Sequence, residues 1–251
     1  MSAEGRDLRP REWSFMLLVV VVAGACIRLG FWQLARLEER REAIQRIQTR
    51  LESAPILIDS SAIDTANAYR RAIAEGEFDL QHQILLENQS LDGQPGFHLI
   101  TPLMFQGEPG GILIDRGWIP FETGIEGELE AFEVPGRHTV TGILIPSVDQ
   151  PTWKFLADPA PGPGDPPLQT WRFLTIDLVQ RQIGYPLAPL ILVQTEALYP
   201  GQALPRPDPR VDLDEGPHLG YAIQWFAFAA IAIIGGGLWI RRKLIQGKVT
   251  S

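Results

Sequence analysis

The residues best suited to do chemistry in this sequence are its four histidines and its single cysteine. The histidines (His82, His98, His138 and His218) show neither the HExxH nor the HxxxH spacing of a zinc site. One cysteine, Cys26, excludes an internal disulfide, a CxxCH haem-attachment site and a dithiol copper site. The sequence also holds no GxSxG motif, P-loop or glycine-rich dinucleotide loop. We therefore expect a protein that is not an enzyme.

His218 is the residue best placed to bind a cofactor. It lies one residue before an uncharged apolar run, and at helical spacing it shares a face with Tyr221, Ala222 and Trp225. An imidazole at a membrane surface could ligate a haem iron while Tyr221 and Trp225 pack against the porphyrin. The alternative is an interfacial histidine within an aromatic belt, which is common in membrane proteins. His98, on a predicted strand, is the next candidate ligand.

Three arginines are candidate binding residues. Arg28 and Arg36 lie two helical turns apart and could pair with haem propionates by bidentate hydrogen bonds. Alternatively, both anchor a helix at the membrane surface by snorkelling. Arg116 follows a predicted strand at 111–114 that runs into a turn, where it could contact a partner protein with Trp118 as the hydrophobic anchor. The alternative is a structural turn in which Arg116 pairs with a nearby acidic residue.

Two apolar runs predict transmembrane helices. The first, at 13–35, is interrupted only by Arg28, and the second, at 219–240, carries no charge. The alternative for the first run is a cleaved signal peptide, since 23–26 resembles a lipoprotein processing site. The residues after Cys26 stay apolar, which favours the transmembrane helix.

The charge distribution predicts the orientation in the membrane. Residues 1–12 are neutral and 241–251 carry +4, so the remainder carries −12 to give −8 overall. The basic tail favours a cytoplasmic C-terminus, and two spans then place the N-terminus inside and the domain outside. The acidic middle argues against nucleic acid as a partner and suits a solvated domain above the lipid. The N-terminus lacks a mitochondrial presequence pattern, so we expect a bacterial cytoplasmic (inner) membrane.

The region between the two runs is predicted to be mainly β-structure. Short runs rich in β-branched and aromatic residues alternate with glycine and proline, a pattern typical of an antiparallel sheet or small barrel. The predicted strands are 69–78, 83–87, 97–101, 111–114, 138–144, 171–176 and 190–195. Residues 158–167 are predicted to form a surface loop.

These elements give one expected order along the chain. The order is a cytoplasmic N-terminus at 1–12, a transmembrane helix at 13–35, its helical extension at 36–55, a periplasmic β-rich domain at 56–198, a proline-rich linker at 199–218, a second transmembrane helix at 219–240 and a cytoplasmic tail at 241–251.

The chain also resembles the Surfeit-locus-one family of cytochrome c oxidase assembly factors over nearly its full length. The resemblance rests on several short pieces that occur in the family's order. They are LGFWQ at 29–33 with Arg36, GEFD at 76–79, LENQ at 86–89, PGFH at 95–98 with TPL at 101–103, DRGWIP at 115–120, TG at 141–142, and HLGYA at 218–222 with WF at 225–226.

The resemblance implies a role in maturing haem-copper oxidase. Bacterial members of the family look like haem a binders that deliver or protect haem for the oxidase's large subunit, alongside other assembly factors. The family's candidate haem histidine falls on His218. A scaffold that stabilises an oxidase intermediate without touching haem, and a membrane-anchored periplasmic enzyme, are the other two possibilities.

Overall fold

A computed structural model describes residues 10–59, 63–107, 109–127, 129–148, 151, 153, 157–159 and 166–249. The chain forms two compact units, which are described separately below. The helical unit consists of Met1–Arg46 and Asp212–Ser251, and the β unit consists of Ile47–Val211.

The helical unit is built from two long helices. Helix α1 spans Pro10–Glu52 and continues into the β unit, and helix α4 spans His218–Val249. Within the described residues, these two helices are long and apolar enough to cross a membrane. Helix α1 contains both the predicted first span and most of its predicted extension.

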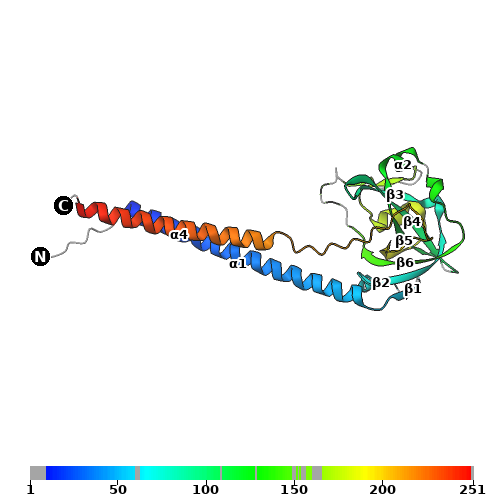
Figure 1. Ribbon diagram of the computed structural model, residues 1–251, viewed down its shortest axis with the longest axis horizontal. Coiled ribbons are helices and arrows are strands. Elements are labelled where there is room, and N and C mark those ends of the chain that lie inside the picture. The colour runs from blue at the N-terminus through cyan, green and yellow to red at the C-terminus, as the bar shows by residue number, and fades with distance from the viewer. Residues whose placement is uncertain are drawn as a thin grey trace. The chain divides into compact units, whose positions relative to one another are not determined.

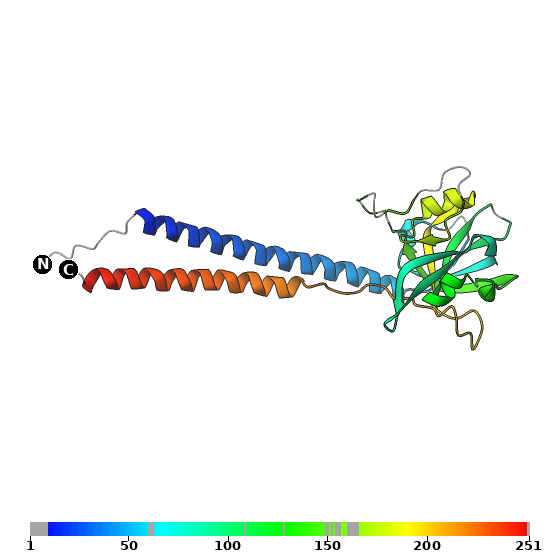
Figure 2. The same ribbon diagram turned by 90° about the horizontal axis from the view of Figure 1, so that it is seen from above.

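Helices α1 and α4 run antiparallel, side by side (Figure 2). Phe15 of α1 lies 4.5 Å from Trp239 of α4 between ring centroids, and Phe31 lies 5.3 Å from Phe226. Most buried positions recur every seven residues, the repeat of a left-handed coiled coil. They are Ala23, Gly30, Leu37 and Ile44 on α1, where Cys26 is also buried, and Ala222, Ala229 and Gly236 on α4.

Small residues allow this close approach. A Cβ added at Gly30 would lie 2.6 Å from the Phe226 ring, and one at Gly236 would lie 2.8 Å from Val19. Ala232, one turn before Gly236 on α4, is only half-buried.

The β unit contains the strands and short helices of the chain (Figure 1). The strands are β1 (Ile56–Ile58), β2 (Arg71–Phe78), β3 (Ile84–Leu91), β4 (Gln94–Phe105), β5 (Gly111–Pro120), β6 (Arg137–Pro146), β7 (Thr170–Trp171) and β8 (Leu187–Gln194). The helices are α2 (Phe121–Glu126), α3 (Ile176–Ile183) and the 3₁₀ turns Thr65–Asn67, Leu80–His82 and Leu129–Phe132.

Five of these strands close into a barrel within the described residues, in the order β2-β6-β8-β5-β4 and back to β2. Strand β4 closes the ring because its first half pairs with β3 and its last residues pair with β2. Gly76 lies at this closure, where a Cβ would approach the Met104 carbonyl oxygen to 2.2 Å. Most pairs are antiparallel, but β1–β2, β3–β7 and β5–β8 are parallel.

The predicted fold class is confirmed: two transmembrane helices flank a mainly antiparallel β domain in the sequence. One predicted strand was wrong. Strand β7 has only two residues, and Ile176 begins α3, whose Ile176, Val179 and Ile183 are buried against the outside of the barrel. Their spacing of three and four residues is helical. In the predicted loop, residues 160–165 lie outside the described residues.

Candidate functional site

His218 is the first residue of α4 and is partly buried against α1. Its Nδ1 lies 2.9 Å from the side-chain oxygen Oε1 of Gln33. An amide oxygen can only accept a hydrogen bond, so this contact places the imidazole proton on Nδ1. The neutral ring then presents a lone pair at Nε2, which is the form of histidine that binds a metal. The heptad packing of the two helices brings Gln33 and His218 together.

The aromatic residues predicted with His218 follow it on α4. Tyr221 is 48% exposed, whereas Trp225 is partly buried and packs edge-on against Phe228 at 6.0 Å. Ala222, between them, is buried against α1. The stripe beside His218 is therefore largely uncovered within the described part of the helical unit, and a flat apolar ligand could lie against it.

The two arginines predicted to pair with propionates, Arg28 and Arg36, both lie exposed on α1. Arg36 forms an ion pair of 2.8 Å with Glu39 and lies over the Trp32 ring at 5.9 Å. Arg28 is exposed and lies about 200° around the helix from Gly30, the buried residue that contacts α4. Arg28 is thus on the face of α1 turned away from His218, and the structure does not bring it to the histidine. Arg36 lies about one helical turn after Gln33 on α1.

A charged collar, formed by Arg40 and Arg41 of α1 with residues 212–215, holds the segment that leads into α4. Arg40 donates hydrogen bonds to the Asp214 carbonyl oxygen at 2.8 Å and to the Asp212 carboxylate at 3.0 Å. Arg41 forms a bidentate pair with Glu215 at 2.9 and 3.0 Å, which raises the pKa of Arg41 and lowers that of Glu215. We did not predict this collar, although Arg40, Arg41 and the acidic residues before His218 were visible in the sequence.

Arg116 and Trp118 were predicted to form a partner surface, and this prediction was wrong. Strand β5 continues to Pro120, so neither residue lies in a turn, and the two side chains are 1% and 6% exposed. The Arg116 guanidinium donates to the Phe132 carbonyl oxygen at 2.7 Å and lies over the Phe78 ring. Burial lowers the pKa of Arg116 to about 10. Its role is therefore to link β5 to the segment around Phe132.

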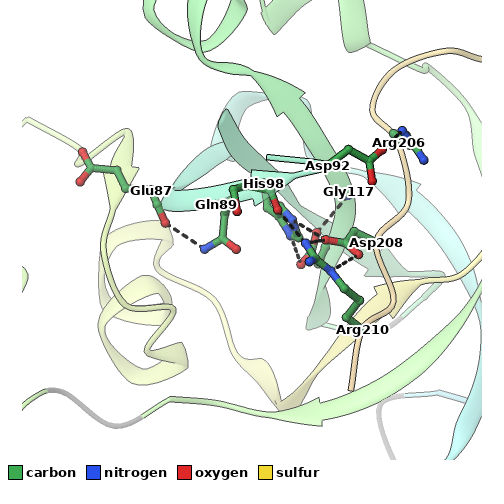
Figure 3. A network of polar contacts seen from close by, with 10 residues as sticks. Glu87, Gln89, Asp92, His98, Gly117, Arg206, Asp208 and Arg210 are labelled. Carbon is green, nitrogen blue, oxygen red and sulfur yellow. Dashed lines mark hydrogen bonds and ion pairs between the residues drawn. The ribbon is translucent and has the colours of Figure 1, made fainter. Parts of the chain in front are cut away.

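The β unit holds a second polar cluster around His98, which is buried on β4 (Figure 3). His98 Nδ1 lies 2.8 Å from Asp115 Oδ2, and Nε2 lies 3.7 Å from Asp208 Oδ2. Both carboxylates are at least nine-tenths buried, and Asp115 also accepts a hydrogen bond from the Gly117 amide. This cluster was not predicted, because its members are far apart in the sequence and only the fold joins them.

The charges around His98 favour its protonated form. Burial alone would lower the pKa of His98, but the hydrogen bond and charge of Asp115, together with the charge of Asp208, raise it above the usual value. Asp208 also pairs with Arg210. Because His98 is buried between Asp115 and Asp208, it does not present a ring nitrogen at the surface.

The His98 cluster holds the segment that leaves the barrel. Arg206 and Trp118 exchange backbone hydrogen bonds of 2.8 and 2.9 Å, and Arg210 donates to the Ser90 carbonyl oxygen at 2.7 Å. Gly117 permits this approach, since a Cβ there would lie 2.2 Å from the Arg206 carbonyl oxygen. Residues 206–210 thus form a strap across β4 and β5.

A third polar group lies at the β2 end of the barrel. Asp79 Oδ2 accepts from Tyr185 at 2.7 Å and lies 2.6 Å from His82 Nδ1. Burial and then the Asp79 carboxylate raise the pKa of Tyr185, while the two hydrogen bonds outweigh burial and lower the pKa of Asp79. Within the described residues, no three His, Cys, Asp or Glu side chains gather as a metal site.

The comparisons with known proteins place the chain in a family. The model of the SURF1 family matches residues 20–230. A SURF1-like protein of Mycobacterium tuberculosis is 29% identical over 92% of this chain and 83% of its own length, and one of Rickettsia felis is 27% identical over 87% and 93%. Surfeit locus protein 1 of Arabidopsis thaliana is 35% identical over 45% of this chain and 35% of its own length. With a match over most of its length, the chain belongs to the SURF1 family.

Proposed function

We propose that this protein is an assembly factor for haem-copper (cytochrome c) oxidase that binds haem a through His218 for insertion into the large subunit. The observation that carries the proposal is the hydrogen bond between His218 Nδ1 and Gln33, which leaves Nε2 free to ligate iron. The ligand lies one residue before the apolar part of α4. A haem bound there keeps its hydrophobic tail in lipid and its propionates near water.

The surrounding residues fit a porphyrin. Tyr221, which is exposed, and Trp225, which is partly buried, follow His218 on α4 and would pack against the ring and exclude water from it. Arg36 is the better candidate for a propionate because its present partner, Glu39, is exposed and readily exchanged. Bound haem would supply the iron centre, while the protein would supply the axial nitrogen, the apolar cover and the anchoring charge.

The orientation is part of the proposal. The basic residues Arg241, Arg242 and Lys243 at the end of α4, and the acidic residues before His218, support cytoplasmic termini and a periplasmic β unit in a bacterial inner membrane. The partners would then be the oxidase's large subunit and other assembly factors at the periplasmic surface of the inner membrane. A reporter active only in the periplasm should work when inserted near Gly162 and fail when fused after Ser251. Activity at the C-terminus would contradict this orientation.

The haem proposal is tested on the purified full chain in detergent, from cells able to make haem A. Wild-type protein should carry stoichiometric haem with the absorption spectrum of a histidine-ligated iron. His218→Ala should fold and insert but lose this haem, because a partly exposed histidine contributes little to stability. His82→Ala, in the β unit, is the control and should keep it. Haem retained by His218→Ala at the wild-type ratio and with an unchanged spectrum would refute the ligand assignment.

A further inference from the structure

We propose that Gln33 is a positioning residue that selects the iron-binding tautomer of His218 and keeps the histidine a moderate ligand from which haem can be released. This inference rests on the proposed function and names the residue that tunes the same site. It starts from the contact between Gln33 and His218, two residues 185 positions apart in the chain.

The geometry of the contact is fixed by helix packing. Gln33 lies between the buried positions Gly30 and Leu37, on the side of α1 that contacts α4. At Gly30 the Phe226 ring occupies the space that a Cβ would fill, so the two helices are held close at this level. Gln33 can therefore reach His218 without a long excursion of either side chain.

The charged residues nearest in sequence are engaged elsewhere. Arg36 pairs with Glu39, Arg40 with Asp212, and Arg41 with Glu215. Among the described residues, the hydrogen-bond partner of the His218 ring is Gln33. Within the described residues, the group that hydrogen-bonds Nδ1 of the proposed ligand is thus an uncharged amide and not a carboxylate.

The chemistry of this partner matters for a carrier. Histidines that bind metals permanently often donate their other N–H to a carboxylate, which makes the imidazole more basic and the metal bond stronger. An amide oxygen orients the ring equally well but attracts the Nδ1 proton less strongly than a carboxylate does. It also avoids placing a negative charge at the edge of the bilayer, where burial of a charge is costly. Gln33 therefore supports orientation without permanent retention.

The experiment titrates full-length protein, purified in detergent from cells that lack haem A synthesis, with haem a. Gln33→Leu removes the acceptor and should weaken binding about 10- to 100-fold. Gln33→Glu keeps the shape and adds the charge, so it should bind more tightly, release haem more slowly and lower the iron midpoint potential. Gln224→Leu, at an exposed position of α4, is the matched control and should behave as wild type.

The outcomes separate this inference from the proposed function. If His218→Ala loses haem while both Gln33 variants keep wild-type affinity and potential, the role of Gln33 is refuted and the ligand assignment stands. If His218→Ala keeps its haem, the proposed function itself fails. A second measurement needs no variant of Gln33: the ¹⁵N shifts of the His218 ring in the haem-free protein should show a proton on Nδ1. A proton on Nε2 alone would overturn the inference.

Discussion

The buried cluster around His98 gives a specific prediction for stability against pH. The perturbation is His98→Gln, which removes the positive charge between Asp115 and Asp208 but keeps an amide that can donate to one of them. The substitution leaves two buried carboxylates without the imidazolium between them. Because Asp115 still accepts from the Gly117 amide and Asp208 still pairs with Arg210, the loss stays below that of a fully unpaired buried charge. We expect about 2–3 kcal/mol of destabilisation at mildly acidic pH.

The sign of the pH dependence follows from the raised pKa of His98. The folded protein holds the proton more tightly than the unfolded chain, whose histidine titrates near pH ~6.5. This contribution to stability is therefore complete below about pH 6.5 and is lost as the pH rises through the folded-state pKa. One proton gives a slope of at most about 1.4 kcal/mol per pH unit in that interval.

The assay is urea unfolding of the full chain in detergent, followed by near-UV circular dichroism between about pH 5.5 and about 8.5, where Asp and Glu stay ionised in the unfolded chain. The difference in free energy of unfolding between wild type and His98→Gln should shrink as the pH rises. Asp115→Asn and the double variant complete a cycle that isolates the coupling of this pair. A wild-type slope equal to that of His98→Gln over the whole interval would refute the reasoning.

Two further predictions concern the barrel closure and the collar. Gly76→Ala should destabilise the β unit by about 1–3 kcal/mol, because the new Cβ meets the Met104 carbonyl oxygen and β2 must move away from β4. The measurement is the unfolding midpoint, which should fall. An unchanged midpoint would contradict the closure of the barrel between β2 and β4. Arg41→Glu should speed amide hydrogen exchange in residues 213–216, and adding Glu215→Arg should restore protection. Equal exchange in all three proteins would show that the pair does not hold this segment.

The sequence predicted the parts of the fold that depend on local periodicity. The apolar runs at 13–35 and 219–240 lie within α1 and α4, and most predicted strands overlap observed ones. The error at Trp171–Ile176 arose where a two-residue strand meets a short helix, because the β-branched residues of α3 suit either structure. Closure of the barrel could not be predicted from local sequence patterns, since it depends on β4 pairing with three different strands.

The candidate site was predicted only in part, for a related reason. His218 was identified from its place beside an apolar run, which is a local feature. Gln33 and the collar depend on the pairing of two helices about 180 residues apart in the chain, which no local pattern reports. Arg116 was misplaced because an arginine after a strand usually reaches solvent. Here the strand continues into the core, and a backbone carbonyl receives the guanidinium.

His98 and His218 show why residue type and position alone could not rank the two candidate ligands. His98 donates from Nδ1 to Asp115 and has the Asp208 carboxylate 3.7 Å from Nε2, so the residue acts as a buried cation that holds the strap. His218 has an uncharged amide at Nδ1, so one nitrogen is occupied, and the other carries the lone pair of the neutral ring. The same imidazole is a structural charge in one unit and a potential ligand in the other. What assigns the roles is the partner that the fold brings to Nδ1, and at His218 that partner is Gln33.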